Sequence, residues 1–180
     1  ADLPPRQRAQ AIRYLPQAGE IAWDLSVRNL VALGRLPHGG GGEAAVEAAL
    51  ASLDLEILSN RPVMSLSGGE KARALLARVL AGEPRWILAD EPLAALDLGH
   101  QLALIAHLRR AAHAGVGVVL VLHDLALAMN QADRVLMLDR GRLAADGSPE
   151  EALTRAVIGR VWRVDARWLG EPGARALVAG

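Results

Sequence analysis

The feature that most constrains the fold is a pair of short apolar runs, each followed at once by polar or charged side chains. Residues 86–89 read WILA and precede Asp90 and Glu91, and residues 116–122 read VGVVLVL and precede His123. An uninterrupted apolar run of this length is typical of a strand that is buried on both faces of a parallel sheet. We therefore predict two buried strands that carry polar side chains at their carboxyl ends.

The segments around these runs have apolar residues at the spacing of a helix. Apolar residues recur at helical spacing from Gly68 until the pattern stops at Gly82, and further helices are predicted over residues 98–113 and 124–131. A third strand is expected over residues 134–138. Strands and helices in alternation predict a parallel α/β sheet with helices on its faces.

The first part of the chain adds one strand and two short helices. We predict a strand over residues 12–15, because Pro16 biases the residue before it towards an extended conformation, and a loop from Gln17. Helices are expected over residues 24–34 and 43–53, where apolar residues follow a helical spacing.

Four polar side chains are the first to follow a predicted strand: Gln17, Asp90, Glu91 and His123. Ligands of parallel α/β sheets bind beyond the carboxyl ends of the strands, so we expect these side chains to converge on one edge. A loop glutamine is usually only solvated, and a lone histidine is more often a buried structural residue. Beside a γ-phosphate, however, His123 could donate a hydrogen bond and sense the phosphate.

Two adjacent acids at the end of a strand can divide a reaction between them. Asp90 could hold Mg²⁺ while Glu91 faces an attacking water as a base. An ordinary turn at the end of a strand explains the pair equally well when it is taken alone. The following Pro92 and the turn over residues 94–97 make the functional interpretation more specific.

The segment LSGGE at residues 66–70 opens the helix that begins near Gly68. Ser67, Gly68 and Gly69 would present a hydroxyl and free backbone N–H groups at the positive end of that helix, which is a mouth suited to phosphate. The structural alternative is a helix cap, in which Ser67 and Glu70 form a capping box.

Taken together, these residues resemble the nucleotide-binding subunits of ABC transporters over essentially the whole chain. The matching motifs are YLPQ at 14–17 (the Q-loop), LSGGE at 66–70 (the signature), WILADEP at 86–92 (Walker B), AALD at 94–97 (the D-loop) and LHD at 122–124 (the switch histidine). Within that superfamily, three segments look similar to importers of ferric siderophores, haem and cobalamin: 26–38, 90–104 and 115–135.

The resemblance implies a P-loop NTPase fold with two parts. A RecA-like core would comprise residues 1–18 and 84–180, a helical subdomain with the signature motif would comprise residues 19–83, and the domain would be truncated at its N-terminus. It also implies that ATP and Mg²⁺ are bound, and that two ATPase subunits pair head to tail as a homodimer.

The resemblance assigns a role to each candidate residue. Asp90 would coordinate Mg²⁺, Glu91 would polarise the attacking water and His123 would contact the γ-phosphate. Gln17 would link the metal to a membrane-facing loop. Asp97 would support the dimer contact, while Ser67, Gly68 and Gly69 would cap the ATP held by the partner subunit. Residues 18–38 would touch a transmembrane permease, which works with a substrate-binding protein.

One part of the family's pattern is absent from these 180 residues. No segment has the phosphate-loop form G-x-x-x-x-G-K-[ST], and Lys71, the only lysine, lies inside the signature helix. The glycine run at residues 39–42 lacks a lysine and a preceding strand. We expect the loop upstream of this chain. The alternative is a short non-catalytic module that docks on a permease or supplies only the signature face.

Composition narrows the class of partner and the location. The formal net charge is zero, so no broad positive field would gather nucleic acid, and the single signature motif also disfavours ABC proteins that act on DNA or ribosomes. Cysteine is absent, and the longest apolar stretch is far shorter than the ~20 residues of a membrane-spanning helix. We expect a peripheral subunit on the cytoplasmic face of the cell membrane.

Overall fold

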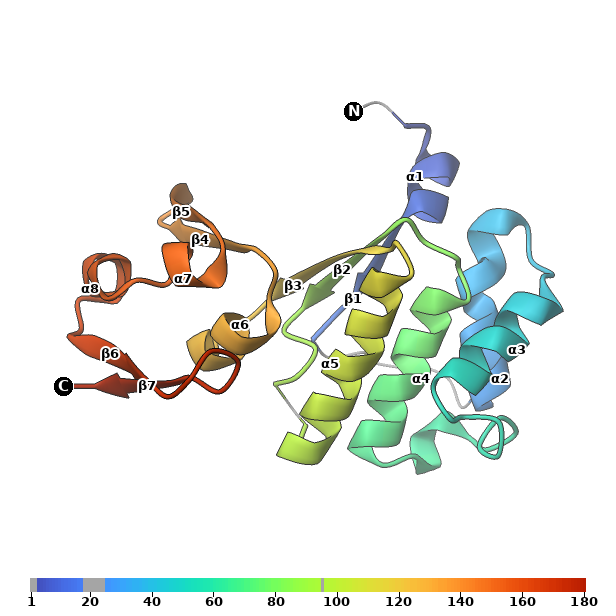
Figure 1. Cartoon of the computed structure of the whole chain (residues 1–180). Helices are drawn as coiled ribbons and strands as arrows, with labels where there is room; N and C mark the ends of the chain where they lie inside the picture. The colour runs from blue at the N-terminus through green and yellow to red at the C-terminus, as the bar shows by residue number, and fades with distance from the viewer. Residues whose placement is uncertain (1–2, 18–24, 95) are drawn as a thin grey trace. The chain divides into compact units, whose positions relative to one another are not determined.

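The computed structural model describes residues 3–17, 25–94 and 96–180. The chain forms two compact units, residues 1–121 and 122–180, each with its own buried core (Figure 1). Unit 1 has one three-stranded sheet, and unit 2 has two two-stranded sheets. The elements of unit 1 are α1 (Pro5–Ala11), β1 (Ile12–Leu15), α2 (Val27–Ala32), the 3₁₀ helix η1 (Leu33–His38), α3 (Glu43–Ser52), the 3₁₀ helix η2 (Val63–Ser65), α4 (Gly68–Leu80), β2 (Trp86–Asp90), α5 (Leu98–His113) and β3 (Gly117–Val121).

Unit 1 is built on a three-stranded parallel sheet in the order β1, β2, β3. Each of these strands was predicted, to within one residue at either end. The helices α4 and α5 lie side by side on one face of the sheet (Figure 1). Leu15, Ile87 and Ala89 are buried on that face, and their burial fixes the register of the strands against the helices.

The prediction that the apolar strands are buried on both faces is wrong for β2. Ile87 is 0% exposed, whereas its neighbours Trp86 and Leu88 are 51% and 39% exposed. Side chains alternate between the two faces of a strand, and α4 and α5 cover only one face. The other face also carries exposed Tyr14 and Val119, which pair in register with Leu88, so it presents a continuous apolar surface.

The helices that precede α4 in the chain pack against it. Ser26 caps α2, since its hydroxyl accepts the Asn29 N–H at 3.2 Å. Arg28 forms ion pairs with Glu43 and Glu47 of α3, which ties α2 to α3. The buried apolar residues of this layer are Val27, Leu30, Val31, Val46, Leu50 and Leu53. The predicted helices are thus present, with α2 beginning at residue 27.

Unit 2 contains the strand that was predicted over residues 134–138, but its pairing differs from the prediction. β4 (Val135–Asp139) pairs antiparallel with β5 (Arg142–Gly147) and is not part of the parallel sheet. Arg140 and Gly141 join the two strands with φ values of 48° and 76°, the combination that a two-residue hairpin turn requires. The remaining elements are α6 (Leu125–Gln131), α7 (Pro149–Ala152), α8 (Arg155–Trp162), β6 (Ala166–Leu169) and β7 (Ala176–Ala179).

Candidate functional site

The carboxyl edge of the parallel sheet brings together three of the predicted site residues. Asp90 ends β2 and lies in register with Val121, the last residue of β3. The Glu91 N–H donates to the Val121 carbonyl at 3.1 Å, so the chain is held against β3 as it leaves β2. The Gln17 side-chain amide donates to the Glu91 carboxylate, Nε2 to Oε2, at 3.0 Å. The expected convergence of Gln17, Asp90 and Glu91 is therefore observed.

Glu91 has a backbone conformation that is unusual for a side chain of its type. Its φ of 45° lies in the left-handed region, which only glycine adopts readily. Strain of this kind persists where surrounding contacts hold the residue, and the bonds from Gln17 and to Val121 are such contacts. The Glu91 carboxylate is thereby held against the Gln17 side chain.

Tyr14 is a neighbour of the acids that the sequence analysis did not single out. Its hydroxyl donates to Asp90 Oδ2 at 3.0 Å across the β1 and β2 pair. This hydrogen bond, with smaller contributions from desolvation and from the negative charge of Asp90, raises the pKa of Tyr14. The bond engages one of the two carboxylate oxygens of Asp90. The parallel pairing of β1 with β2, which brings Tyr14 near the carboxyl end of β2, was the only sequence signal for it.

His123 follows β3 by two residues and belongs to unit 2. Its placement beside Glu91 therefore stays a prediction. Asp124 caps α6, since its carboxylate accepts the Leu127 N–H at 2.9 Å. The backbone around His123 is thus the junction between the end of β3 and the capped start of a helix, as predicted.

The side chains at this edge suit Mg²⁺ bound mainly through a nucleotide. Mg²⁺ takes oxygen ligands and usually keeps several waters, with one or two carboxylates and substrate phosphates completing its shell. Asp90 has one oxygen engaged by Tyr14, and the bond from Gln17 uses its amide nitrogen, not its amide oxygen. Among residues 3–17, 25–94 and 96–180, no three His, Cys, Asp or Glu residues gather into a protein-only metal site. The donors fit the predicted assignment of Asp90 and Gln17.

The start of α4 has both of the features weighed for LSGGE. The Ser67 hydroxyl accepts the Glu70 N–H at 3.3 Å, and the Glu70 carboxylate accepts the Ser67 N–H at 2.8 Å, so the capping box is present. The bond from the Ser67 backbone is the main reason that the pKa of Glu70 is lowered. Ser67 and Gly68 are nevertheless exposed, and a Cβ on Gly68 would meet open space. The helix start is both capped and open to a ligand.

A histidine outside the predicted set packs directly on this helix start. A Cβ added to Gly69 would lie 1.9 Å from His100 Cδ2, so only glycine leaves room for the imidazole. The same ring is held through Nδ1 by Asp97 Oδ2 at 2.8 Å, while Asp97 Oδ1 accepts the His100 N–H and caps α5. These bonds, the backbone one first, lower the pKa of Asp97. Asp97 is thus linked to Gly69 through His100.

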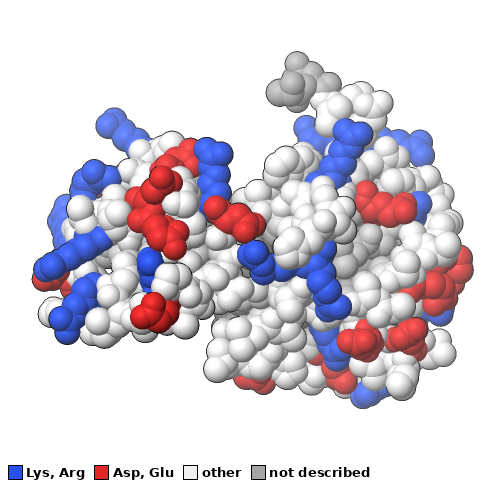
Figure 2. Space-filling view, viewed as in Figure 1, with Lys and Arg blue, Asp and Glu red and all other residues white. Residues whose placement is uncertain are grey.

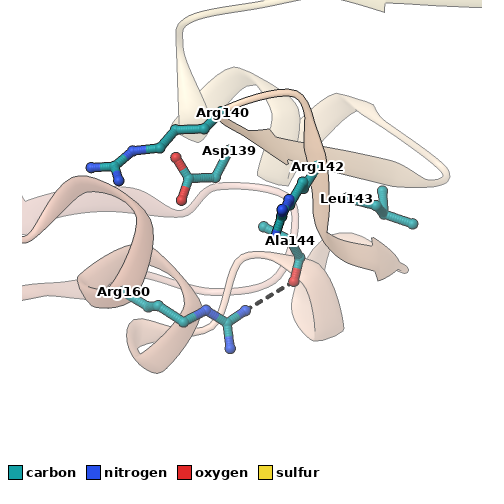
Figure 3. A pocket seen from close by; sticks show the side chains of 6 residues that line it. All are labelled: Asp139, Arg140, Arg142, Leu143, Ala144 and Arg160. Atoms are coloured by element: carbon teal, nitrogen blue, oxygen red, sulfur yellow. Dashed lines mark hydrogen bonds between the residues drawn. The ribbon is translucent and has the colours of Figure 1, made fainter.

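Unit 2 contains a separate charged hollow. It has a volume of about 690 Å³ and lies beside the β4–β5 turn, where Figure 3 shows Arg140, Arg142 and Arg160 around Asp139. Arg160 Nη2 donates to the Ala144 carbonyl at 2.9 Å. This wide hollow contains none of the predicted site residues.

The described part of the chain has no helix of sufficient length and apolarity to span a membrane. Charged side chains of both signs are interspersed on the face shown in Figure 2. Neither unit presents a broad single-sign surface in that view.

The amino-acid sequence is similar to those of known proteins. The family model described as ABC transporter matches residues 3–94. The hemin import ATP-binding protein HmuV of Streptomyces coelicolor is 43% identical over 169 residues, which cover 91% of this chain and 60% of that protein. HmuV of Shewanella denitrificans is 40% identical over 175 residues, which cover 92% of this chain and 69% of that protein. The chain thus spans about 60% of the length of the first of these relatives.

Solved structures show the same likeness. A metal-chelate type ABC transporter in an inward-facing conformation superposes with a TM-score of 0.83 at 25% identity, covering 94% of this chain and 72% of the other. The ADP conformation of the ATP-binding cassette MJ1267 superposes with a TM-score of 0.77 at 22% identity, covering 88% of this chain and 70% of that one. The second likeness concerns the fold alone.

Proposed function

Because this chain belongs to the ABC transporter family, we propose that it is the ATP-binding and ATP-hydrolysing subunit of an importer. The likeness to solved cassettes confirms the predicted P-loop NTPase fold. The observation that carries the proposal is the edge of the sheet, where the Gln17 amide binds Glu91 at 3.0 Å beside Asp90. The division into a RecA-like core and a helical subdomain over residues 19–83 is part of the same proposal.

The residues at this edge would act on ATP as follows. Bound Mg²⁺, held by Asp90 and Gln17, would screen the phosphate charges. Glu91 would orient the attacking water and accept its proton, since its carboxylate stands at the end of β2 with one oxygen fixed by Gln17. His123 would donate a hydrogen bond to the γ-phosphate. A permease that moves the loop at Gln17 would displace a direct hydrogen-bond partner of Glu91.

The signature face would act on the ATP of a second subunit. Ser67 and Gly68 are exposed at the positive end of α4, a helix of 13 residues, so they can present their donors to a phosphate outside this subunit. Asp97 would contribute to the same dimer contact. His100 links Asp97 to Gly69, which ties the two motifs into one surface for a head-to-tail homodimer.

We also propose that a segment outside these 180 residues supplies the phosphate loop. The uncovered face of the sheet supports this, because parallel sheets are almost always covered on both faces. Tyr14, Trp86, Leu88 and Val119 form that exposed apolar face. A strand, phosphate loop and helix added there would bury it. The 180-residue chain alone should then show no ATPase activity above background and weak affinity for Mg-ATP.

The transported substrate is proposed from the relatives. Two hemin import ATP-binding proteins are 43% and 40% identical to this chain, and a metal-chelate type transporter matches its structure. An iron-siderophore, haem or cobalamin-type substrate is therefore the proposal, delivered by a substrate-binding protein to transmembrane permease subunits. The chain would sit peripherally on the cytoplasmic face of the membrane.

The decisive experiment uses the gene with its upstream sequence. If an in-frame extension encodes a phosphate loop, Glu91→Gln in the extended protein should retain Mg-ATP binding and lose turnover, because the amide cannot accept the proton of water. Glu56→Gln, an exposed acid remote from β2, is the matched control and should keep full activity. Unchanged hydrolysis by Glu91→Gln would show that Glu91 is not the base.

The non-catalytic module is the alternative outcome of the same experiment. The absence of a phosphate loop within these 180 residues is the observation that favours it. A start codon and ribosome-binding site at Ala1 would establish it. Docking on a permease would then be the remaining function, and co-purification with the permease would test it. Micromolar binding of Mg-ATP to the 180-residue chain, measured by calorimetry, would contradict both versions.

A further inference from the structure

We infer that Arg13 and Arg78 form a binding site for a small oxyanion of the phosphate type, at the end of α4 opposite to the signature motif. Both residues line one cavity of about 300 Å³ in unit 1. The other residues that line it are Ala9, Ile12, Tyr14, Leu33, Gly34 and Val79, most of them apolar.

The cavity lies far from the proposed nucleotide contacts of α4. Arg78 is 11 residues after Ser67, and a helix rises about 1.5 Å per residue, so roughly 16 Å separate the two positions along the axis. An anion held by Arg78 would therefore be distinct from a phosphate at the Ser67 end. The site does not depend on the proposed ATPase function.

Two glycines allow the close packing around this cavity. A Cβ on Gly82 would lie 2.4 Å from Arg13 Nε, so the guanidinium of Arg13 occupies space that only glycine leaves open. A Cβ on Gly34 would lie 2.1 Å from the Arg78 carbonyl oxygen, so η1 approaches the last turns of α4 closely. The Arg13 guanidinium is thus built into the packing, and the backbone that carries Arg78 is held close to η1.

Their hydrogen-bonding capacity is largely unused. Arg13 Nη2 donates to the Gly34 carbonyl at 2.5 Å, but Arg13 Nε is buried without a partner. The Arg78 side chain has no hydrogen bond or ion pair to any residue of the described ranges. Arg35, their third cationic neighbour, also has a buried Nε without a partner, but its Nη1 binds the Ala81 carbonyl and the Glu83 carboxylate. Two of the three arginines therefore lack an anionic partner within the described chain.

The positive charge of Arg13 is repelled by those of Arg35 and Arg78. Desolvation lowers the pKa of Arg13 first, and the positive charges of Arg35 and Arg78 lower it further. Burial alone lowers the pKa of Arg78. A desolvated charge is stable only when it is paired, and a bound anion would supply the pairing that no described carboxylate gives.

The chemistry of the site selects the ligand. Guanidinium groups bind tetrahedral and planar oxyanions through paired N–H donors, and low-dielectric walls strengthen such bonds. Ile12, Leu33 and Val79 supply those walls. The volume admits one phosphate group with water. Inorganic phosphate is therefore the probe for the experiment.

The experiment measures phosphate binding to the 180-residue chain by isothermal titration calorimetry, at constant ionic strength adjusted with sodium chloride. Wild type should bind one phosphate. Arg78→Gln and Arg13→Gln should each weaken binding about ten- to a hundred-fold, the loss expected for a charge-assisted hydrogen bond. Arg85→Gln removes the same charge from an exposed position outside the cavity and should bind as wild type does.

Two further variants keep the test decisive. Arg78→Met should raise the melting temperature in phosphate-free buffer, because it removes an unpaired desolvated charge, and should lose the additional stabilisation by phosphate. Ser67→Ala should bind phosphate normally. If binding is lost in Ser67→Ala but kept in Arg78→Gln, the phosphate lies at the signature helix and the proposal is wrong. The proposal is also wrong if wild type binds no phosphate at concentrations up to about 10 mM.

Discussion

Replacing Gly69 by alanine tests whether His100 holds the signature motif in place. The added Cβ would lie 1.9 Å from His100 Cδ2 and 2.3 Å from Nε2. Ordinary carbon contacts lie at about 3.5–4.0 Å, so the ring would have to move by roughly 1.6 Å or more. Such a movement breaks the 2.8 Å bond between His100 Nδ1 and Asp97 Oδ2.

The expected magnitude follows from three contributions. Overpacking of this kind typically costs about 1–3 kcal/mol, and a lost, partly exposed hydrogen bond costs a further ~0.5 kcal/mol. In the opposite direction, alanine stabilises the interior of a helix by about 1 kcal/mol relative to glycine, and by less in the first turn. Gly69→Ala should therefore lower the free energy of unfolding by about 1–2 kcal/mol. In a His100→Ala background the same substitution should be neutral or stabilising, a coupling of about 2 kcal/mol.

Urea denaturation followed by far-UV circular dichroism measures this cycle. Gly68→Ala is the matched control, because it lies one position earlier in α4 and its Cβ would meet nothing within 4 Å. It should leave stability unchanged or raise it by less than about 1 kcal/mol. If Gly69→Ala proves as mild as Gly68→Ala, or if the coupling with His100→Ala is below about 0.5 kcal/mol, His100 does not constrain the signature helix.

Three other predictions follow from single contacts. Ser67→Ala should lower the free energy of unfolding by about 1 kcal/mol through loss of the helix cap, and urea titration showing no change would mean that the capping box is not formed in solution. Gly34→Ala should destabilise by about 3 kcal/mol, because its Cβ would meet a backbone oxygen at 2.1 Å that cannot rotate away; a melting temperature equal to that of wild type would contradict this packing. Tyr14 is the only tyrosine, so absorbance at alkaline pH should titrate above the ordinary value of about 10, and Asp90→Asn should lower the midpoint. Since the folded pKa of Tyr14 is raised, its contribution to stability is complete below about pH 10 and is lost as the pH rises through the folded value, which denaturation at two pH values would reveal.

The elements that could be predicted are those in which local pattern and tertiary packing agree. The helix α4 combines a cap, a periodic apolar face and a terminating glycine, and each of these signals points to the same bounds. The helix α1 was missed, because its residues are polar and none is buried; Pro5 in its first turn and the bonds of Arg6 and Gln10 to the Pro37 carbonyl sustain it. Those bonds join positions about 30 residues apart, and no local pattern encodes them.

The same distinction explains what the sequence could and could not say of the site. The rule that strand ends converge located Gln17 with Glu91, because it depends only on strand order and direction. The part played by His100 depends on which turn of α5 passes the start of α4, a property of helix packing that a one-residue change in loop length would alter. The exposed face of Trp86 and Leu88 was misjudged for a different reason. An apolar run reflects what the complete sheet buries, whereas the described residues of unit 1 cover one face only. An apolar surface that the chain itself leaves open is thus informative, because the cost of exposing it predicts that a covering element exists.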